Sequence, residues 1–368
     1  MGIITAHSSK ETVRDIVSDI GNQTSDFNPN AVIYFASSRF DPESLSQQMQ
    51  EQFKNASLFG CSTAGEIVSG KMLKGSVAAM LFDSESIADI CISVVENILS
   101  ENHIPDAFGR FEAYYRTLMA EMDFEKYVGI ILADGLSGAE EKLMEKIGDL
   151  TDVVFIGASA GDDLKFKQTY IYADGKAYTD AAVLALIRPA YGFDVIKTQS
   201  FCALDKKLTA TKVNEAKRTV LEFDHKPAAS AYAEALGIPV KEAGSHFMRH
   251  PLGLMFGDEP YVRSPQQFRG NDMAFYCNIK EGMELSLLES TDIVSDTRQA
   301  LAEKKAELNS ISGIINFHCI LRTLELEQKG QTEAYGNIFS DIPTAGFSTY
   351  GEEYIGHINQ TSTMLVFR

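Results

Sequence analysis

The sequence predicts an α/β fold with mixed sheets, in which duplicated β-α-β-β units form two related domains. Three observations support this prediction. A glycine-rich motif occurs three times, an apolar β-type run precedes each copy at a similar distance, and an apolar strand entered through a glycine turn follows each copy. Such connections imply parallel pairing across the helix and antiparallel pairing within the hairpin.

The repeated segment, called the glycine motif below, combines glycine, hydroxyl and carboxylate side chains. Its glycines are expected to supply positive φ values for turns or bulges, and its hydroxyls could satisfy nearby backbone groups. The same chemistry could hold a ligand, so both interpretations stay open from the motif alone. The three copies are Gly60–Glu66 (GCSTAGE), Gly157–Asp162 (GASAGD) and Gly346–Glu352 (GFSTYGE).

A β-type run and a helix are expected before each motif. The run ends 25, 25 and 29 residues before the first glycine of the three motifs. In the first copy Asp41 can cap the helix and Pro42 fits its first position, and in the second copy Ser137 could be the cap. The β-type runs are 31–35, 128–132 and 313–317, and apolar stripes at helical spacing are Leu45, Met49 and Phe53, then Leu143, Ile147 and Leu150.

The strands after the motifs complete the repeating unit and set the expected domain count. The first glycines of the motifs lie 97 and then 189 residues apart. This spacing suggests four units of roughly 92 residues, with a weaker fourth copy near 253–259. We therefore expect two domains, 1–220 and 221–368, with the boundary between 190 and 222. The following strands are 77–82, 182–187 and 363–367.

Composition limits the classes of partner and compartment. The 368 residues, 45% hydrophobic and 23% charged, describe a globular chain long enough for two cores. With 33 Lys and Arg against 51 Asp and Glu, the net charge of −18 disfavours nucleic acid and anionic membrane surfaces as partners. The five scattered cysteines fit a reducing compartment, and no segment resembles a signal peptide or a membrane span. We expect a cytoplasmic protein without membrane insertion.

The first and third motifs carry the side chains best suited to a small polar ligand. Their hydroxyl pairs and backbone N–H groups can cradle a carboxylate, and their glutamates could take an ammonium group. Together these are the two ends of an amino acid. The middle motif keeps one hydroxyl and is expected to be structural. The candidate ligand-binding residues are Ser62, Thr63 and Glu66 in the first motif, and Ser348, Thr349 and Glu352 in the third.

Three further side chains are candidates for the same ligand. Asp134 follows an apolar strand, and α/β proteins gather ligands at the carboxyl ends of strands, although Asp134 could only shape the turn into the next helix. Arg322 and Arg263 could each make a two-pronged contact to a carboxylate or an ordinary salt bridge.

A catalytic alternative rests on Ser159, which lies in a GxSxG segment after an apolar strand, as in a hydrolase nucleophile elbow. The other two motifs contain one more residue, and a strained elbow would not tolerate that insertion. No acid and histidine follow Ser159 at a spacing that selects them as triad partners. We therefore expect no enzymatic activity and no catalytic residue. The histidines form no HExxH pair, and no metal site is expected.

Taken in order along the chain, these motifs resemble the FIST family, which joins an N-terminal and a C-terminal FIST domain. The resemblance covers almost the whole length. It implies a bacterial sensory protein in signal transduction that binds a small ligand such as an amino acid. Because no output domain is visible in this chain, the resemblance implies a separate histidine kinase or chemoreceptor-type partner. The segments that carry it, besides the glycine motifs, are Asp134–Ser137, His250–Gly253, Tyr261–Arg263 and Phe317–Arg322.

A haem-binding alternative also comes from the resemblance, since a branch of the family is reported as haem-binding nitric-oxide sensors that regulate a histidine kinase. Nothing in the sequence specifies that branch, and no cofactor is otherwise expected. If haem is bound, His250 is the first axial candidate, followed by His318 and the thiols of Cys61 or Cys319.

Overall fold

The computed structural model describes residues 2–99 and 103–368, and these residues form two compact units. The chain passes between the units four times, whereas the sequence suggested one boundary between 190 and 222, a range that contains the first passage at Lys197–Thr198. The first unit contains Met1–Lys197, Thr297–His357 and Ser362–Arg368, and the second contains Thr198–Asp296 and Ile358–Thr361.

The first unit consists of three copies of one β-α-β-α-β-hairpin-β repeat. The first repeat contains β1 (Ile3–Ser8), α1 (Val13–Gln23), β2 (Ala31–Ser37), α2 (Pro42–Gln52), β3 (Ser57–Thr63), β4 (Glu66–Val68), β5 (Lys71–Leu73) and β6 (Val77–Phe82). The second contains β7 (Ile87–Glu96), α3 (Ile104–Tyr115), β8 (Val128–Ala133), α4 (Glu140–Gly148), β9 (Phe155–Ser159), β10 (Ile171–Ala173), β11 (Lys176–Tyr178) and β12 (Ala181–Pro189). The third contains β13 (Phe193–Gln199), α7 (Ile293–Leu308), β22 (Gly313–Cys319), α8 (Ile320–Gln328), α9 (Thr332–Gly336), β23 (Thr344–Thr349), β24 (Glu352–Tyr354), β25 (His357–Ile358) and β26 (Thr361–Phe367).

Each repeat supplies the four long strands of one six-stranded mixed sheet, and the three sheets share one strand order. The four long strands are ordered β1-β6-β2-β3 in the first sheet, β7-β12-β8-β9 in the second and β13-β26-β22-β23 in the third. In each sheet the two strands that flank the crossover helix pair in parallel, and the returning strand pairs antiparallel. The predicted α/β class with mixed sheets is therefore confirmed.

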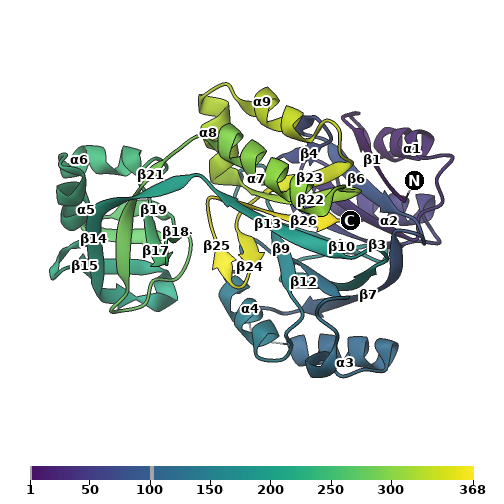
Figure 1. Cartoon of the computed structure of the whole chain (residues 1–368), viewed down its shortest axis with the longest axis horizontal. Helices are drawn as coiled ribbons and strands as arrows, with labels where there is room; N and C mark the ends of the chain where they lie inside the picture. The colour runs from purple at the N-terminus through teal and green to yellow at the C-terminus, as the bar shows by residue number, and fades with distance from the viewer. Residues whose placement is uncertain (1, 100–102) are drawn as a thin grey trace. The chain divides into compact units, whose positions relative to one another are not determined.

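The short hairpin of each repeat does not join its own sheet. The hairpin β4–β5 pairs with β23 of the third repeat, β10–β11 pairs with β3 of the first, and β24–β25 pairs with β9 of the second. Figure 1 shows the yellow β24 and β25 beside the teal β9. The three repeats thus exchange their hairpins in a closed cycle, and each sheet is complete only with a strand from another repeat.

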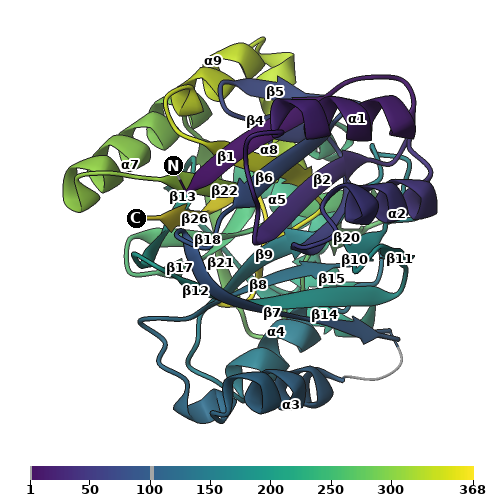
Figure 2. The same ribbon diagram turned by 90° about the vertical axis from the view of Figure 1, so that its right-hand side faces the viewer.

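The sheets are covered on both faces, which explains why their strands read as continuous apolar runs. One face of each sheet contributes to a shared central core that includes Phe35, Leu132 and Phe317. The opposite face of the first sheet packs on α1 and α2, and Figure 2 shows these two helices side by side. The opposite face of the second sheet packs on α3 and α4.

Local sequence explains the helix starts in part. Asp41 caps α2 by accepting the Ser44 backbone N–H at 2.8 Å, with Pro42 at the first helical position, as predicted. In the second repeat the expected cap is wrong, because α4 has Ala139 at its N-cap. The Ser137 hydroxyl instead donates to the Asp134 carbonyl at 2.7 Å.

The second unit is built around one eight-stranded sheet of order β18-β17-β21-β14-β15-β20-β19, with β16 paired to β15. The fourth repeat expected near 253–259 is wrong: these residues form the antiparallel hairpin β17–β18, with no crossover helix between its strands. The strands are β14 (Phe201–Asn214), β15 (Thr219–Phe223), β16 (Lys226–Pro227), β17 (Leu252–Phe256), β18 (Glu259–Arg263), β19 (Pro265–Arg269), β20 (Asp272–Phe275) and β21 (Glu284–Ser290), and the helices are α5 (Ala228–Leu236) and α6 (Val240–Ala243).

Within 2–99 and 103–368, no helix has both the length and the apolar character needed to span a bilayer.

Candidate functional site

The glycine motifs lie where the hairpins cross from one sheet to another. A Cβ added to Gly60, Gly157 or Gly346 would lie 1.9, 1.7 or 2.1 Å from a backbone carbonyl oxygen of the adjacent parallel strand. The expectation that the motif glycines all supply positive φ values is wrong, because among them only Gly65 has one, at 135°. Their common role is to let two backbones approach closely.

Backbone hydrogen bonds tie the three motifs into a ring. Each motif is bonded to the next, so the ring forms only when all three repeats are present. The bonds are Gly161 N–H to Ser62 O (2.9 Å), Ser159 N–H to Gly351 O (2.9 Å) and Ala64 N–H to Ser348 O (3.1 Å).

Strand register shows that the middle motif differs from the other two. Glu66, Ile171 and Glu352 occupy equivalent positions, because each pairs with the residue that follows the first motif glycine on the receiving strand. The preceding turn has two residues in the first and third repeats (64–65 and 350–351) and ten in the second (161–170). Asp162 is therefore part of an insertion and is not the counterpart of the two glutamates.

The threonine and glutamate side chains of the first and third motifs bond to each other inside the protein, whereas the Ser62 hydroxyl donates to the Gly161 carbonyl at 2.7 Å. Thr63 Oγ1 donates to Glu66 Oε1 at 2.5 Å, and Thr349 Oγ1 donates to Glu352 Oε1 at 2.7 Å. Burial raises the pKa of Glu66 to about 7, against the opposing effect of hydrogen bonds from Ser76 and Thr63. All four motif side chains are buried. Their roles in ligand binding stay predictions.

The remaining candidates lie in three separate places. Asp134 shapes its own turn, since its carboxylate accepts from Thr169 Oγ1 (2.5 Å) and from backbone N–H groups of Leu136 and Asp180. Arg263 belongs to the second unit, where it donates to the Val262 carbonyl at 3.3 Å. Arg322 and Ser348 lie in a different setting, the interior of the third repeat. The structure therefore groups only part of the predicted set.

The interior of the third repeat is polar where the other two repeats are apolar or aromatic. Three buried positions on β22 and β26 carry Asn316, His318 and Ser362. The strand registers give the counterparts in the first and second repeats: Tyr34 and Ile131 for Asn316, Ala36 and Ala133 for His318, and Val77 and Ala182 for Ser362.

The first and second repeats serve as a comparison for the third, because all three have the same fold within one chain. The same fold is built twice with Ala, Val, Ile or Tyr at these positions, so folding does not require an amide, an imidazole or a serine hydroxyl there. Burying such groups costs free energy unless they are hydrogen-bonded. A functional role accounts for their presence better than a structural one.

Neighbouring side chains extend these three residues into a buried polar group that contains several hydrogen-bonded pairs, called the polar cluster below. Ser362 Oγ donates to Asn316 Oδ1 at 2.8 Å, and Arg322 Nη2 donates to Thr297 Oγ1 at 3.0 Å. The cluster therefore joins β22, β26, α7 and α8. Its members are Thr297, Asn316, His318, Arg322, Thr323, Tyr335, Ser348 and Ser362, with Thr323 and Ser348 hydroxyls 2.7 Å apart and Asn316 Nδ2 3.2 Å from the Tyr335 hydroxyl.

His318 is the unusual member of the polar cluster. Its side chain is fully buried, and neither ring nitrogen has a hydrogen-bond partner among the described residues. Burial, and secondarily the positive charge of Arg322, hold the pKa of His318 well below its ordinary value. The ring is thus neutral at pH 7 and offers one donor and one acceptor. Buried polar groups in native proteins are normally satisfied, by water or a ligand if not by protein.

Two members of the polar cluster, Arg322 and Ser348, are site residues predicted from the sequence, and most of the others were missed. Asn316 lies inside the run 313–317, which reads as an ordinary apolar strand, and His318, considered from the sequence only as a haem ligand, follows that run directly. A position-by-position comparison of the three runs would have revealed them, since only the third carries polar residues at inward positions.

The four haem candidates lie in two settings, three of them in the closed interior and one at a half-buried position. His318, Cys61 and Cys319 are enclosed in packed interior, so a ligand as large as haem would have to displace their neighbours. His250 is half-buried, with Nδ1 3.2 Å from the Leu288 carbonyl and its ring stacked on His246. Within the described ranges, no three His, Cys, Asp or Glu side chains are placed to hold a metal ion.

A second buried group surrounds Ser159, the residue of the hydrolase alternative. Ser159 Oγ donates to Glu353 Oε1 at 3.2 Å, and His357 Nδ1 lies 3.1 Å from the same oxygen. The carboxylate therefore separates the serine from the histidine, whereas a catalytic triad requires the histidine to contact the serine. Burial alone would lower the pKa of His357, but the Glu353 carboxylate outweighs it and raises that pKa to about 9. A protonated histidine cannot accept the serine proton.

The Glu353–His357 pair predicts a loss of stability at alkaline pH. Because the pKa of His357 is raised from 6.5 to about 9 on folding, its contribution is fully present below pH 6.5 and is lost as the pH rises through about 9. The contribution is at most about 3 kcal/mol. Nearby Glu140 and Glu141 raise the same pKa. Urea unfolding at pH 7 and pH 10 checks this prediction.

The matched comparison is His357→Gln, which removes the titrating group. The free energy of unfolding of the native protein should exceed that of the variant at pH 7, and the difference should shrink by pH 10. A difference that stays constant between the two pH values would contradict the assignment.

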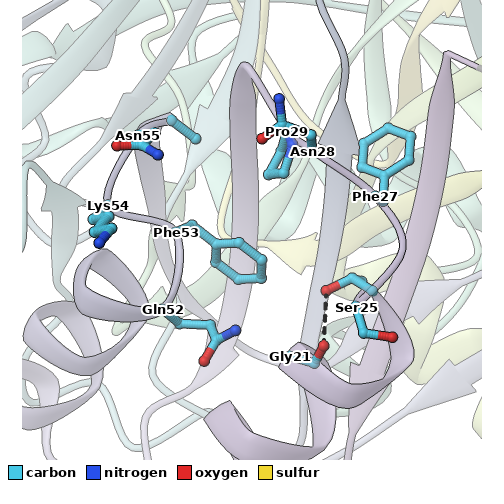
Figure 3. A pocket seen from close by; sticks show the side chains of 11 residues that line it. Gly21, Ser25, Phe27, Asn28, Pro29, Gln52, Phe53, Lys54 and Asn55 are labelled. Atoms are coloured by element: carbon cyan, nitrogen blue, oxygen red, sulfur yellow. Dashed lines mark hydrogen bonds between the residues drawn. The ribbon is translucent and has the colours of Figure 1, made fainter.

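A surface hollow of about 230 Å³ lies between the C-terminal ends of α1 and α2. Figure 3 shows Gln52 and Phe53 from the end of α2 on one side and Ser25 and Phe27 on the other. It contains none of the predicted site residues.

The fold and the polar cluster together define an α/β protein with a repeated architecture and one repeat specialised for polar chemistry. The chain belongs to the FIST family: the FIST N domain matches residues 30–226 and the FIST C domain matches residues 228–354. Domains of this family are associated with sensing in signal transduction.

Among curated proteins, the chain is similar to an uncharacterized protein of Methanocaldococcus jannaschii. The two are 25% identical over 299 residues, which cover 75% of this chain and 57% of that protein. The chain thus spans just over half the length of this relative.

Proposed function

We propose that this chain is a non-catalytic sensor of a small polar metabolite, such as an amino acid, and that the polar cluster of the third repeat recognises the metabolite. The observation that carries the proposal is the comparison among repeats. Only the third repeat replaces an apolar sheet–helix interface with Asn316, His318 and Ser362.

The chemistry of the cluster suits a carboxylate-containing ligand. Arg322 is a buried cation whose planar guanidinium matches a carboxylate, and the neutral His318 can donate one hydrogen bond and accept another. The hydroxyl group of Thr297 accepts a hydrogen bond from Arg322, and Thr323 follows Arg322 in the sequence. A zwitterionic metabolite of a few heavy atoms is the class that matches these groups.

Chain connectivity supports a signalling role for the cluster. Thr297 is the residue at which the chain re-enters the first unit after Asp296, and Ser362 is the residue at which it re-enters after Thr361. At two of the four points where the chain passes between the units, the residue on the first-unit side thus belongs to the polar cluster. A ligand that binds two arrangements of these residues with different affinity shifts their equilibrium. A cytoplasmic histidine kinase or chemoreceptor-type partner would read the change.

A thermal-shift screen of amino acids and related metabolites tests this proposal. At a concentration 100 times its Kd, a ligand should stabilise the native protein by about 2.7 kcal/mol. His318→Leu removes two unpartnered nitrogens, so this variant should be at least as stable as the native protein and yet lose the ligand-induced shift.

The control is His246→Leu, the same replacement in the second unit, which should keep the shift. A shift that survives in His318→Leu would exclude the polar cluster as the site. No shift of the native protein with any amino acid would remove the amino-acid version of the proposal.

A further inference from the structure

The ten-residue turn 161–170, called the inserted loop below, has no structural necessity in this fold. The first and third repeats make the same passage between sheets with two residues each, 64–65 and 350–351. The extra residues therefore serve something other than closing the turn. Long ordered loops on a rigid scaffold commonly carry function.

The inserted loop is held firmly at its base. The Asp162 carboxylate accepts the backbone N–H groups of Phe166 (2.9 Å), Lys167 (2.6 Å) and Gln168 (3.1 Å), and it also accepts the Tyr350 hydroxyl. Burial alone would raise the pKa of Asp162, but these donors outweigh it and hold that pKa below its ordinary value. The carboxylate is thus ionised and fixes the loop backbone.

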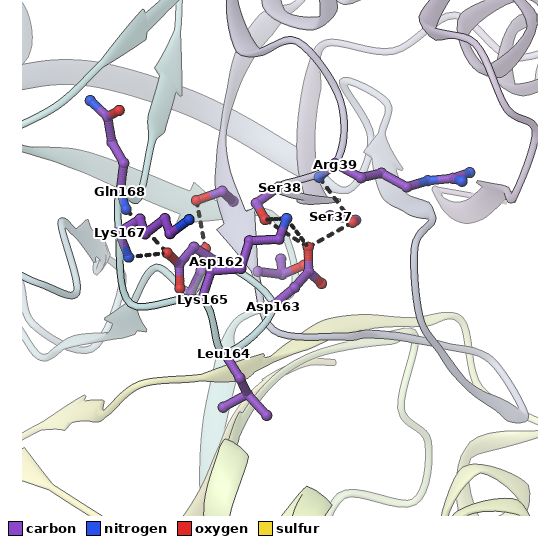
Figure 4. Close-up of polar contacts among 12 residues, drawn as sticks. Ser37, Ser38, Arg39, Asp162, Asp163, Leu164, Lys165, Lys167 and Gln168 are labelled. Carbon is purple, nitrogen blue, oxygen red and sulfur yellow. Dashed lines mark hydrogen bonds and ion pairs between the residues drawn. The ribbon is translucent and has the colours of Figure 1, made fainter.

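Further contacts anchor the inserted loop to all three repeats. Asp163 Oδ2 accepts from the hydroxyls of Ser37 (2.9 Å) and Ser38 (2.7 Å) of the first repeat, as Figure 4 shows. Thr169 contacts Asp134 of the second repeat at 2.5 Å, and the Leu164 N–H donates to Tyr350 of the third at 3.0 Å. Such anchoring gives the loop one conformation rather than many.

In this fixed conformation, the inserted loop exposes apolar side chains to solvent. Asp163, Leu164 and Phe166 all have left-handed backbones, with φ of 54°, 62° and 50°. Non-glycine residues rarely adopt this region, and they persist there only where surrounding contacts enforce it. Leu164 is 37% exposed and Phe166 is 56% exposed, with the Phe166 ring stacked on Tyr350 at 5.0 Å.

Two lysines alternate with the exposed apolar residues. The sequence of the tip is Leu164-Lys165-Phe166-Lys167, and both lysines are exposed. Lys165 is engaged locally, with its Nζ 3.8 Å from Asp163 Oδ2 and donating to Ser38 Oγ at 2.9 Å, so Lys167 supplies the positive charge at the tip. Rigid exposed aromatic residues of this kind are typical anchors of protein interfaces.

We propose that the inserted loop is a docking element that places Leu164 and Phe166 in an apolar pocket with an acidic rim on a partner protein. Lys167 matches the acidic rim, and the fixed backbone removes the entropic cost of ordering the loop on binding. An anionic membrane is disfavoured as the occupant, because the net charge of −18 opposes approach to such a surface. The proposal does not depend on the identity of the metabolite.

Photo-crosslinking in the cells that naturally produce the full chain tests the proposal. Phe166→p-benzoylphenylalanine places a crosslinker at the tip, and the same replacement of Tyr114, another exposed aromatic residue, serves as the control position. We expect a protein adduct from position 166 but not from position 114. Mass spectrometry should place the crosslink in an apolar segment flanked by Asp or Glu.

Variants at other positions of the inserted loop test whether the crosslink reports specific docking or only chance proximity. Lys167→Glu and Leu164→Ser should each reduce the adduct at least tenfold, whereas Lys176→Glu, on a different exposed strand, should leave it unchanged. Thermal melting of each variant establishes that the fold is intact, and the two docking variants test charge and apolar contact independently. No adduct at 166, an adduct insensitive to both variants, or an adduct with lipid would overturn the proposal. None of these outcomes bears on the ligand-induced thermal shift.

Discussion

A chain truncated after residue 227, which retains the FIST N domain alone, should not form a cooperatively folded protein. Such a fragment leaves the hairpin β4–β5 without β23 and leaves β9 without β24. It also removes Phe317 and Phe347 from the central core. Loss of two buried phenylalanines alone corresponds to about 6–10 kcal/mol, which is comparable to the whole stability of a typical domain.

Circular dichroism and NMR of the fragment check this prediction. We expect insoluble protein, or soluble protein without a cooperative thermal transition and with poorly dispersed amide signals. Co-expression of residues 228–368 should restore a soluble complex, because it returns the missing strands. A monomeric fragment with a sharp melt and dispersed spectra would show that the hairpin exchange is not needed for folding.

Gly157→Ala should destabilise the protein strongly, although it adds only one methyl group. The new Cβ would lie 1.7 Å from the Ile131 carbonyl oxygen, and both atoms belong to backbones of paired strands that cannot rotate away. Overpacking of this kind costs about 3 kcal/mol or more, and for a chain of 368 residues the Tm should fall by roughly 4 °C or more.

The control for this prediction is Gly148→Ala at the end of α4, where a Cβ would meet no atom within 4 Å. Scanning calorimetry should show a large fall in Tm for Gly157→Ala and little change for Gly148→Ala. Equal Tm values for the two variants would mean that the strands can separate locally, and would refute close approach as the reason for the glycine.

Much of the local structure was predictable from the sequence. The runs before and after each motif are strands, the interval holds a helix, and Asp41 with Pro42 begins α2 as expected. These features depend on residues close together in the chain, whose preferences act locally. The cap of α4 was mispredicted because Ser137 lies two residues before the N-cap, where its hydroxyl donates to the Asp134 carbonyl and accepts the Ala139 N–H at 3.2 Å.

The larger arrangement was less predictable. Periodicity suggested a fourth repeat near Gly253, but a glycine and an apolar run also occur in an antiparallel hairpin, which is what these residues form. The insertion after Ala160 was hidden because Gly161 and Asp162 happen to reproduce the end of the motif. Strand register, which depends on a distant partner, was needed to see that Ile171 is the true counterpart of Glu66.

The candidate site was also predicted only in part from the sequence. Arg322 and Ser348 were identified from residue type, whereas Asn316, Ser362 and Thr297 were not. The hydroxyl–carboxylate pairs of the motifs, such as Thr63 with Glu66, looked like ligand groups because a sequence does not show whether the two side chains already bond to each other.

The sequence by itself determined the elements, the threefold recurrence of the glycine motif, the α/β class and the family. These features follow from short-range patterns and from the order of motifs, which can be read from the sequence without knowledge of tertiary contacts. Only the tertiary structure decided which sheet each hairpin joins. It also showed why Gly60, Gly157 and Gly346 are needed: each lies where the backbones of two paired parallel strands pass within contact distance. It alone also placed Thr297, Asn316 and Ser362 together, because hydrogen-bond partners separated by tens of residues are chosen by packing and not by local sequence.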